Sequence, residues 1–178
     1  MKNLIPLFLF VCLMSACKKE ITDLPGHTQN GANTFGAKIN GEMWGPQGFG
    51  PFPADNILVA TILGNDIRIE VQNFASSPNE TGMYIYLTNV LAPGNYPLNT
   101  TVTHPTTAAN YAFFVKRRLH PLSEWITTGA KTGSVTVTKI DRTQKIIAGT
   151  FAFTAHPILN NEDAPLVVTE GRFDIQLK

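Results

Sequence analysis

Cysteine is almost absent from this 178-residue sequence, and its two cysteines, Cys12 and Cys17, both lie near the start. A disulfide framework within the rest of the chain is therefore excluded. Neither sign of charge dominates, with 14 basic against 13 acidic residues, so there is no broad electrostatic footprint for nucleic acid. Runs with the period of an amphipathic helix are also missing, whereas β-branched and aromatic residues are frequent. We expect one all-β domain that binds no nucleic acid.

The first sixteen residues have the layout of a secretory signal peptide. A basic start at Lys2 is followed by an apolar run over residues 4–14 and by two small residues before Cys17. A membrane-spanning helix needs about 20 apolar residues, and this run has roughly half that length. Residues 1–16 are therefore predicted to be removed, which leaves equal numbers of basic and acidic side chains in the mature chain.

Residues 13–17, which read Leu-Met-Ser-Ala-Cys, resemble the lipobox of bacterial lipoproteins. The resemblance implies that acyl chains such as palmitate are attached to Cys17, first on its thiol and then on its new amino group. Each buried CH₂ contributes about 0.8 kcal/mol, so two or more acyl chains hold a protein stably at a membrane. Ordinary secretion with cleavage elsewhere is the alternative. Since Lys18 is not the acidic residue that retains some lipoproteins at the inner membrane, we expect the outer membrane, on either face.

Residues 17–33 are predicted to be the lipidated cysteine and a flexible tether. The stretch from Lys18 to Asn33 is polar, contains proline and glycine, and shows no periodicity. A flexible coil of about 16 residues spans roughly 20–25 Å on average. The folded domain is expected over residues 34–178.

Short apolar or alternating segments separated by turn residues fill that domain. Asn40-Gly41 has the composition of a type I′ hairpin turn, whose two central residues need positive φ. About ten strands are expected, over residues 35–39, 42–44, 56–63, 67–71, 83–90, 110–115, 125–127, 134–140, 147–155 and 167–177. Strands this close together pair antiparallel, because parallel pairs need long crossovers. The pattern favours a single antiparallel β-sandwich, with a closed or partly open β-barrel as the alternative.

Several motifs resemble a known family. Residues 34–44 read TFGAKINGEMW, and GSVTVTKID, AGTFAF and TEGRFDI follow at residues 133–141, 148–153 and 169–175. In this order they resemble the opening (F-G-x-x-V-N-G-x-x-aromatic) and the ending of a family of small Bacteroidota lipoproteins of unknown function. The resemblance implies a cell-envelope lipoprotein with an all-β domain. Since the family has no known activity, no catalytic residue is transferred.

No catalytic or metal-binding constellation stands out. The four histidines, His27, His104, His120 and His156, are not at metal-ligand spacings, and a zinc site needs three or four convergent ligands. Three of them precede proline, which places them in extended loop segments. No Gly-x-Ser-x-Gly elbow marks a nucleophilic serine. We expect no metal, no cofactor and no catalytic residue, with a hydrolase acting on envelope polymers or glycans as the alternative.

Aromatic residues are the most suggestive candidates for a binding site. Trp44, Phe49 and Phe52 surround a Gly/Pro-rich loop, and Tyr84 and Tyr86 share one face of a predicted strand. Aromatic platforms bind sugars and peptides, although such residues in a small β domain usually belong to the core. We therefore expect a non-enzymatic binding or structural module on a lipid anchor, whose partner is a glycan, a peptide or an envelope protein.

Overall fold

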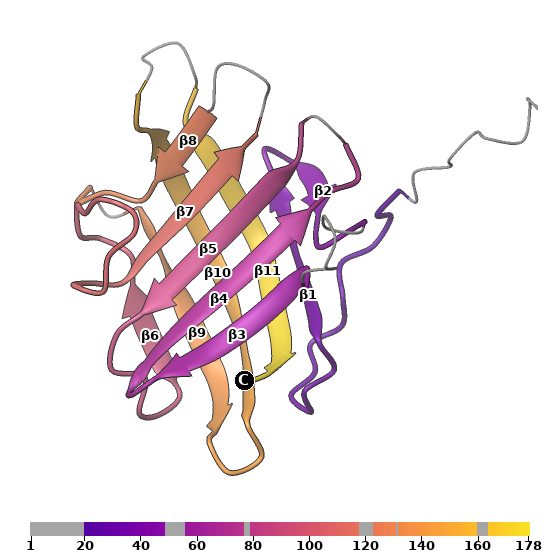
Figure 1. Cartoon of the computed structure of the whole chain (residues 1–178), viewed down its shortest axis with the longest axis vertical. Helices are drawn as coiled ribbons and strands as arrows, with labels where there is room; N and C mark the ends of the chain where they lie inside the picture. Colours follow the sequence, from indigo (N-terminus) through magenta and orange to yellow (C-terminus); the bar gives the residue numbers. More distant parts are fainter. Residues whose placement is uncertain (1–19, 49–55, 77–78, 118–122, 131, 160–163) are drawn as a thin grey trace, which may run out of the picture.

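The computed structural model of the chain describes residues 20–48, 56–76, 79–117, 123–130, 132–159 and 164–178. Within these residues it has eleven strands and no helix, so the predicted all-β class is confirmed (Figure 1). The strands are β1 (Thr34–Ile39), β2 (Glu42–Trp44), β3 (Leu58–Leu63), β4 (Asp66–Asn73), β5 (Thr81–Leu87), β6 (Gly94–Pro97), β7 (Tyr111–Lys116), β8 (Ser123–Ile126), β9 (Gly133–Asp141), β10 (Ile146–Pro157) and β11 (Leu166–Gln176). The predicted signal peptide and Cys17 lie outside the described residues.

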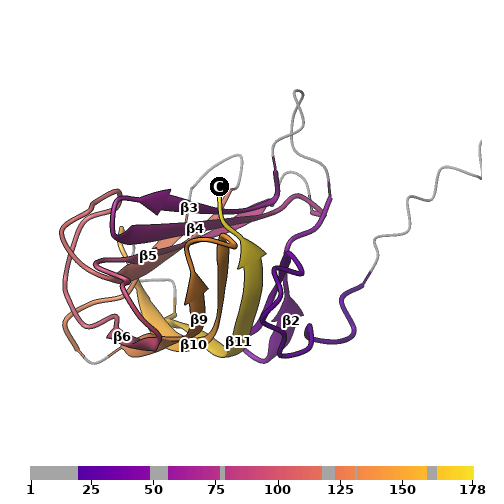
Figure 2. The same cartoon turned by 90° about the horizontal axis from the view of Figure 1, so that it is seen from below.

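The strands form one curled antiparallel sheet that folds over on itself. Its main path runs β2-β1-β11-β10-β8-β7-β5-β4-β3, while β9 and then β6 pair onward from the first part of β10. We call β2, β1, β11, β10, β9 and β6 layer A, and β8, β7, β5, β4 and β3 layer B. Figure 2 shows the two layers facing each other. Strand β10 joins them, because Ile146–Phe153 pair with β9 whereas His156 and Pro157 pair with β8.

The free side of β3 is partly closed by the end of the chain. Lys178 donates its backbone N–H to the carbonyl of Ala60 at 2.9 Å, and Ile62 donates to the carbonyl of Lys178 at 3.3 Å. The two layers therefore touch at both margins. The fold is a sandwich that approaches a partly open barrel, which covers both architectures predicted from the sequence.

The core lies between the layers and follows the two-residue alternation of the sequence. In β4, Ile67, Ile69 and Val71 are fully buried, while Arg68 between them is exposed, as that pattern predicts. Residues 56–63, which include β3, are mostly apolar, a composition typical of a strand that is buried on both faces. Only Ala60 of that strand is fully buried, because β3 lies at the margin of the sheet and has one long neighbour instead of two.

Turn chemistry explains one success and one miss of the strand assignments. Asn40 and Gly41 have φ of 49° and 89°, which confirms the predicted hairpin between β1 and β2. Strand β6 was missed, because its glycine and proline are typical of a turn. It pairs only with β9, and an edge strand tolerates a proline that cannot donate a backbone hydrogen bond.

The segment before β1 differs from the free tether that its composition predicts. Residues 20–33 lie against layer A and are fixed there by hydrogen bonds. Asp174 accepts the backbone N–H groups of Asn30 at 3.0 Å and of Gly31 at 2.7 Å. Arg172 donates to the carbonyl of Pro25 at 3.1 Å. Polar composition predicted a coil correctly, but it gave no sign that outward-facing side chains of β11 would bind the coil's backbone.

Candidate functional site

The outer face of layer B carries an aromatic cluster that is separate from the core. Register aligns Arg68, Tyr86 and Tyr111 in one row across β4, β5 and β7. The next row contains Glu70, Tyr84, Phe113 and Ile126, the last from β8. A sheet face with this much aromatic surface must be covered in a stable monomer.

The irregular segment over residues 98–110 provides part of that cover. The ring of His104 stacks on Phe113 with centroids 3.9 Å apart and planes inclined by 11°. Its Nδ1 lies 3.0 Å from the hydroxyl of Tyr111, and Val102 packs on the same cluster. This irregular segment is thus a covering element of layer B, and the ring of His104 is its main contact with the sheet.

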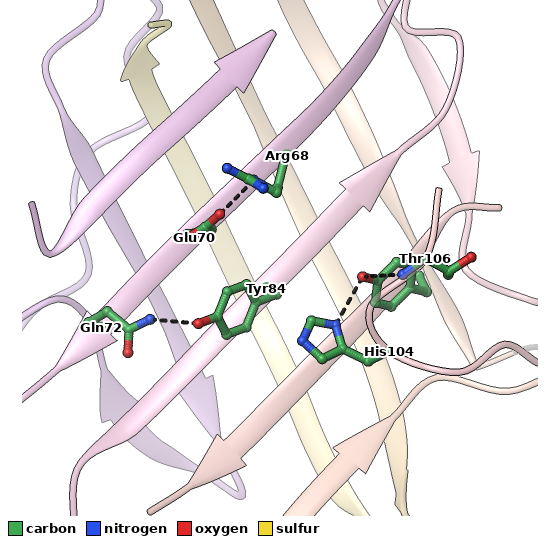
Figure 3. Close-up of polar contacts among 7 residues, drawn as sticks. Arg68, Glu70, Gln72, Tyr84, His104 and Thr106 are labelled. Carbon is green, nitrogen blue, oxygen red and sulfur yellow. Dashed lines mark hydrogen bonds and ion pairs between the residues drawn. The ribbon is translucent and has the colours of Figure 1, made fainter. Parts of the chain in front are cut away.

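Between this segment and the margin of the sheet lies a pocket of about 580 Å³. Its floor is formed by Arg68, Glu70, Tyr84 and Tyr86, and its wall by residues 104–107; we call it the tyrosine pocket. Tyr84 lies between Gln72 on one side and His104 on the other (Figure 3). This volume falls within the range of about 300–1,000 Å³ that is typical of small-molecule sites.

Hydrogen bonds fix the aromatic floor from its edges. The hydroxyl of Tyr86 donates to Asp66 Oδ2 at 2.7 Å. Gln72 donates through Nε2 to the hydroxyl of Tyr84 at 3.1 Å, and the Oε1 of the same amide accepts from Arg117 at 2.8 Å. The ring of Tyr84 is therefore held in place before any ligand arrives, which lowers the entropic cost of binding.

Burial keeps three of the ionisable groups of the pocket neutral. It lowers the pKa of His104 and raises the pKa of Tyr111. Burial, together with the hydrogen bond to Asp66, raises the pKa of Tyr86 to about 12. At neutral pH the charged groups that line the pocket are Arg68 and Glu70, which form an ion pair through the arginine Nε.

The hydrogen bond between His104 and Tyr111 uses one of the two ring nitrogens of the histidine. The hydroxyl oxygen of Tyr111 accepts the backbone N–H of Thr106 over a long 3.5 Å and forms a second hydrogen bond with His104 Nδ1. A phenol hydroxyl can donate or accept, so this contact suits either tautomer of the imidazole. Nε2 donates when Nδ1 accepts, and accepts when Nδ1 donates.

The predicted aromatic platform is only partly assembled. Tyr84 and Tyr86 line the pocket and share one face of β5, as predicted. Ile85 and Leu87, on the opposite face of the strand, are fully buried in the core. Trp44, in contrast, is 8% exposed and packs edge-on against Phe114 with centroids 5.8 Å apart. Phe49 and Phe52 lie outside the described residues.

Several residues of the pocket were not recognised from the sequence as ligand contacts, and three of them carry the ring surface or a charge. They are Arg68, His104 and Tyr111. A signal for Tyr111 exists, because β7 is apolar at every position from Tyr111 to Val115, which requires cover on both faces. Nothing in the sequence places His104 on Phe113, since that contact depends on how a loop folds back over the sheet.

The structure describes three of the four histidines. Among the residues that it describes, no group of three histidine, cysteine or acidic side chains lies close enough to hold a metal ion. His120 lies outside those residues. A search of the described part of the chain also finds no helix whose length and apolar character would let it cross a membrane.

Comparison with known proteins identifies a family without a known function. No match is found among curated proteins or among solved structures. A family model matches residues 33–174, which include all eleven strands except the end of β11. The predicted membership of an uncharacterised family is thereby confirmed. The chain belongs to the DUF6252 family, described as a domain of unknown function.

Proposed function

We propose that this protein is a lipid-anchored, non-enzymatic binding module of the bacterial cell envelope, and that its ligand occupies the tyrosine pocket. The observation that carries the proposal is the pocket itself. Its tyrosines are fixed by Asp66 and Gln72 before a ligand is present, and its volume suits a small molecule.

The side chains of the pocket favour binding over catalysis. Nucleophilic catalysis needs a hydroxyl or thiol within hydrogen-bond reach of a base. His104 directs Nδ1 to the phenol of Tyr111, and the hydroxyl of Thr106 accepts the N–H of Ala108 at 3.1 Å. Among the residues that the structure describes, no serine or cysteine lines this pocket. The Nδ1 atom of His104 is thus engaged by a phenol and not by a serine or a cysteine.

The position of the N-terminal segment is compatible with an anchor that leaves the pocket open. Residues 20–33 run along layer A, whereas the pocket lies on the outer face of layer B. Figure 2 shows the two layers on opposite sides of the molecule. A lipid at Cys17 would be joined to the domain through the segment on layer A. The secretory layout of residues 1–16 and the lipobox-like residues 13–17 support that anchor.

Metabolic labelling with palmitate tests the anchor. The wild-type protein is expected to incorporate label and to sediment with membranes, while Cys17→Ala abolishes labelling and releases the protein from the membrane fraction. The matched control is Cys12→Ala, which removes the other cysteine of the chain and should leave labelling intact. Label that persists in Cys17→Ala would refute the anchor.

Binding is tested on the full-length protein in lipid nanodiscs by backbone NMR titration. The probes are maltotriose, trialanine and hexanoate, which represent a saccharide, a peptide and a lipid tail. Shifts from at least one probe should cluster on residues 68–70, 84–86 and 104–107. If none of the three perturbs these residues, the assignment of the binding site is wrong.

A further inference from the structure

We infer that the tyrosine pocket is a site for a neutral oligosaccharide. This inference rests on the proposed function, since it names the chemical class of the ligand for the same pocket. It is drawn from three properties of the described side chains: their balanced charge, the half-buried rings of Tyr84 and His104, and the alternation of hydrogen-bond donors and acceptors across the floor.

Charge balance selects a neutral ligand. Arg68 and Glu70 are neighbours on one face of β4 and pair with each other, with 46% and 30% of their side chains exposed. An anion at Arg68 would have to displace Glu70 or lie close to its carboxylate, and a cation at Glu70 would meet the same obstacle from Arg68. A hydroxyl-bearing ligand can bond to both without breaking the pair, because hydroxyls both donate and accept.

The ring faces provide the apolar half of the site. Tyr84 is half-buried, and its ring centroid lies 5.2 Å from that of His104 at an inclination of 47°. The two rings therefore form an angled wall and floor. Pyranose rings present a flat face of C–H groups with hydroxyls at their edges, which suits an aromatic face bordered by polar groups.

Donors and acceptors are spaced around those rings. The hydroxyl oxygen of Tyr84 accepts from Gln72, which leaves its hydrogen available to a ligand. His104 Nε2 can form a further hydrogen bond as donor or acceptor, while Glu70 offers a carboxylate oxygen and Arg68 offers the remaining guanidinium N–H groups. Neighbouring hydroxyls of a sugar can each find a partner of the right kind in this arrangement.

A peptide fits the surroundings of the pocket less well. Peptides commonly bind by adding a strand to a free sheet edge. The nearest edge is β3, where Ala60 and Ile62 already exchange backbone hydrogen bonds with Lys178. The pocket therefore offers side chains but no unoccupied strand edge at its nearest margin.

The test is a titration of the full-length protein in lipid nanodiscs, followed by NMR. Maltotriose, cellotriose and the trimer of N-acetylglucosamine are the neutral probes. A galacturonic acid trimer and a glucosamine trimer are the charged ones. At least one neutral probe should bind with a Kd below about 10 mM, with shifts at Tyr84 and His104, and the charged trimers should bind more weakly.

Variants separate a specific site from a chance contact. Tyr84→Ala removes the ring face and should raise the Kd for the neutral probe at least about tenfold, or roughly 1.4 kcal/mol. Arg68→Ala, at an exposed position that does not endanger folding, should weaken it several-fold. Lys38→Ala is the matched control, because Lys38 is the basic partner of the exposed ion pair with Glu170 on layer A. It should leave binding unchanged.

Each outcome has a defined meaning. If no neutral trimer binds, or if binding survives both pocket variants, the saccharide assignment is wrong. If trialanine or hexanoate instead shifts the pocket residues, the saccharide assignment fails while the proposed binding site stands. If no probe of any class shifts them, both fail.

Discussion

The two outer faces of this sandwich are covered by segments of similar length in different ways. Residues 20–33 lie on layer A and are held by directed hydrogen bonds, chiefly to Asp174 and Arg172. Residues 98–110 lie on layer B and are held mainly by ring packing around His104. The first covering fixes the backbone of the segment, whereas the second leaves a pocket beside it.

The difference follows from which groups each layer directs outward. Asp174 is 1% exposed, and its carboxylate accepts hydrogen bonds from residues 28–32 of the covering segment. Burial alone would raise its pKa. Hydrogen bonds from the Thr28 side chain and from the backbone N–H groups of Asn30, Gly31 and Ala32 outweigh burial, and the pKa of Asp174 is lowered. The charged form thus stabilises the docked segment.

The close approach of the segment to layer A also depends on one glycine. A Cβ at Gly36 would lie 2.7 Å from Cδ of Pro25 and 3.3 Å from the side chain of Leu24. Gly36 belongs to the opening motif of the family-like sequence. Its role is therefore to admit the N-terminal segment, and no comparable glycine is needed under His104, which stacks on a flat ring instead.

The largest expected effect comes from removing the carboxylate that docks the N-terminal segment. Asp174→Ala deletes the acceptor for at least two backbone N–H groups, and hydrogen bonds to a charged group contribute about 1.5–3 kcal/mol each. We expect a loss of about 3 kcal/mol in the free energy of unfolding, since detachment of the segment limits the total. Urea denaturation measures this loss, and hydrogen exchange at Asn30 and Gly31 should become fast.

Two variants control that experiment. Glu170→Gln breaks only the exposed pair with Lys38 and should change stability by less than about 1 kcal/mol. Asp174→Asn keeps one acceptor oxygen, so its loss in the free energy of unfolding should lie between those of Asp174→Ala and Glu170→Gln. Because the pKa of Asp174 is lowered in the folded state, the wild type should lose the same stabilisation only as pH falls below about 4. Unchanged exchange at Gly31 in Asp174→Ala would contradict this account.

A pair of glycine substitutions sharpens the comparison at an intermediate size. In Gly149→Ala, within layer A, the new Cβ would lie 2.3 Å from the carbonyl oxygen of Thr136 and 2.7 Å from the ring of Phe173. In Gly82→Ala, on layer B, the nearest atom at 2.8 Å is the flexible Oε1 of Gln72. We expect the first to destabilise by about 1–3 kcal/mol and the second by clearly less.

Thermal unfolding of both variants measures that difference. Both variants add the same methyl group. A difference in their stability therefore reports how far the atoms around each glycine can move to make room for it. Gln72 also donates a hydrogen bond to Tyr84. Gly82→Ala should therefore change the NMR chemical shifts of the residues that line the tyrosine pocket, even if the variant keeps its stability. Equal losses of stability in the two variants would show that layer B is as rigid around this site as layer A.

The sequence predicted the strands better than what lies over them. Alternation in β4 and the Asn40-Gly41 turn are local properties, and both were found as expected. Asp174 and Arg172 lie two apart on one strand, a spacing that suits a surface ion pair. Each instead binds backbone from residues 20–33, more than a hundred positions away. Spacing along one strand carries no information about such a partner.

The candidate site was half predicted for the same reason. Tyr84 and Tyr86 share a face by the period of a strand, and the structure places both at the pocket. Trp44 was also a predicted ligand contact but lies in the core, where its ring packs against those of Phe35 and Phe114. His104 could not be placed, because three-dimensional packing of an irregular segment decides which ring it contacts.

The smallest expected effect is a pH dependence confined to the covering of layer B. Burial lowers the pKa of His104 below its usual 6.5, so the unfolded chain binds a proton there before the folded chain does. Stability should therefore fall as pH drops below about 6.5 and level off below the lowered pKa of the folded state. His104→Phe keeps a ring on Phe113 but cannot titrate. The melting temperature measured between about pH 7.5 and 5 should decline more in the wild type than in this variant, with the other histidines common to both. Parallel pH profiles would mean that protonation of His104 costs the folded state nothing, and that the segment over layer B is held independently of this ring.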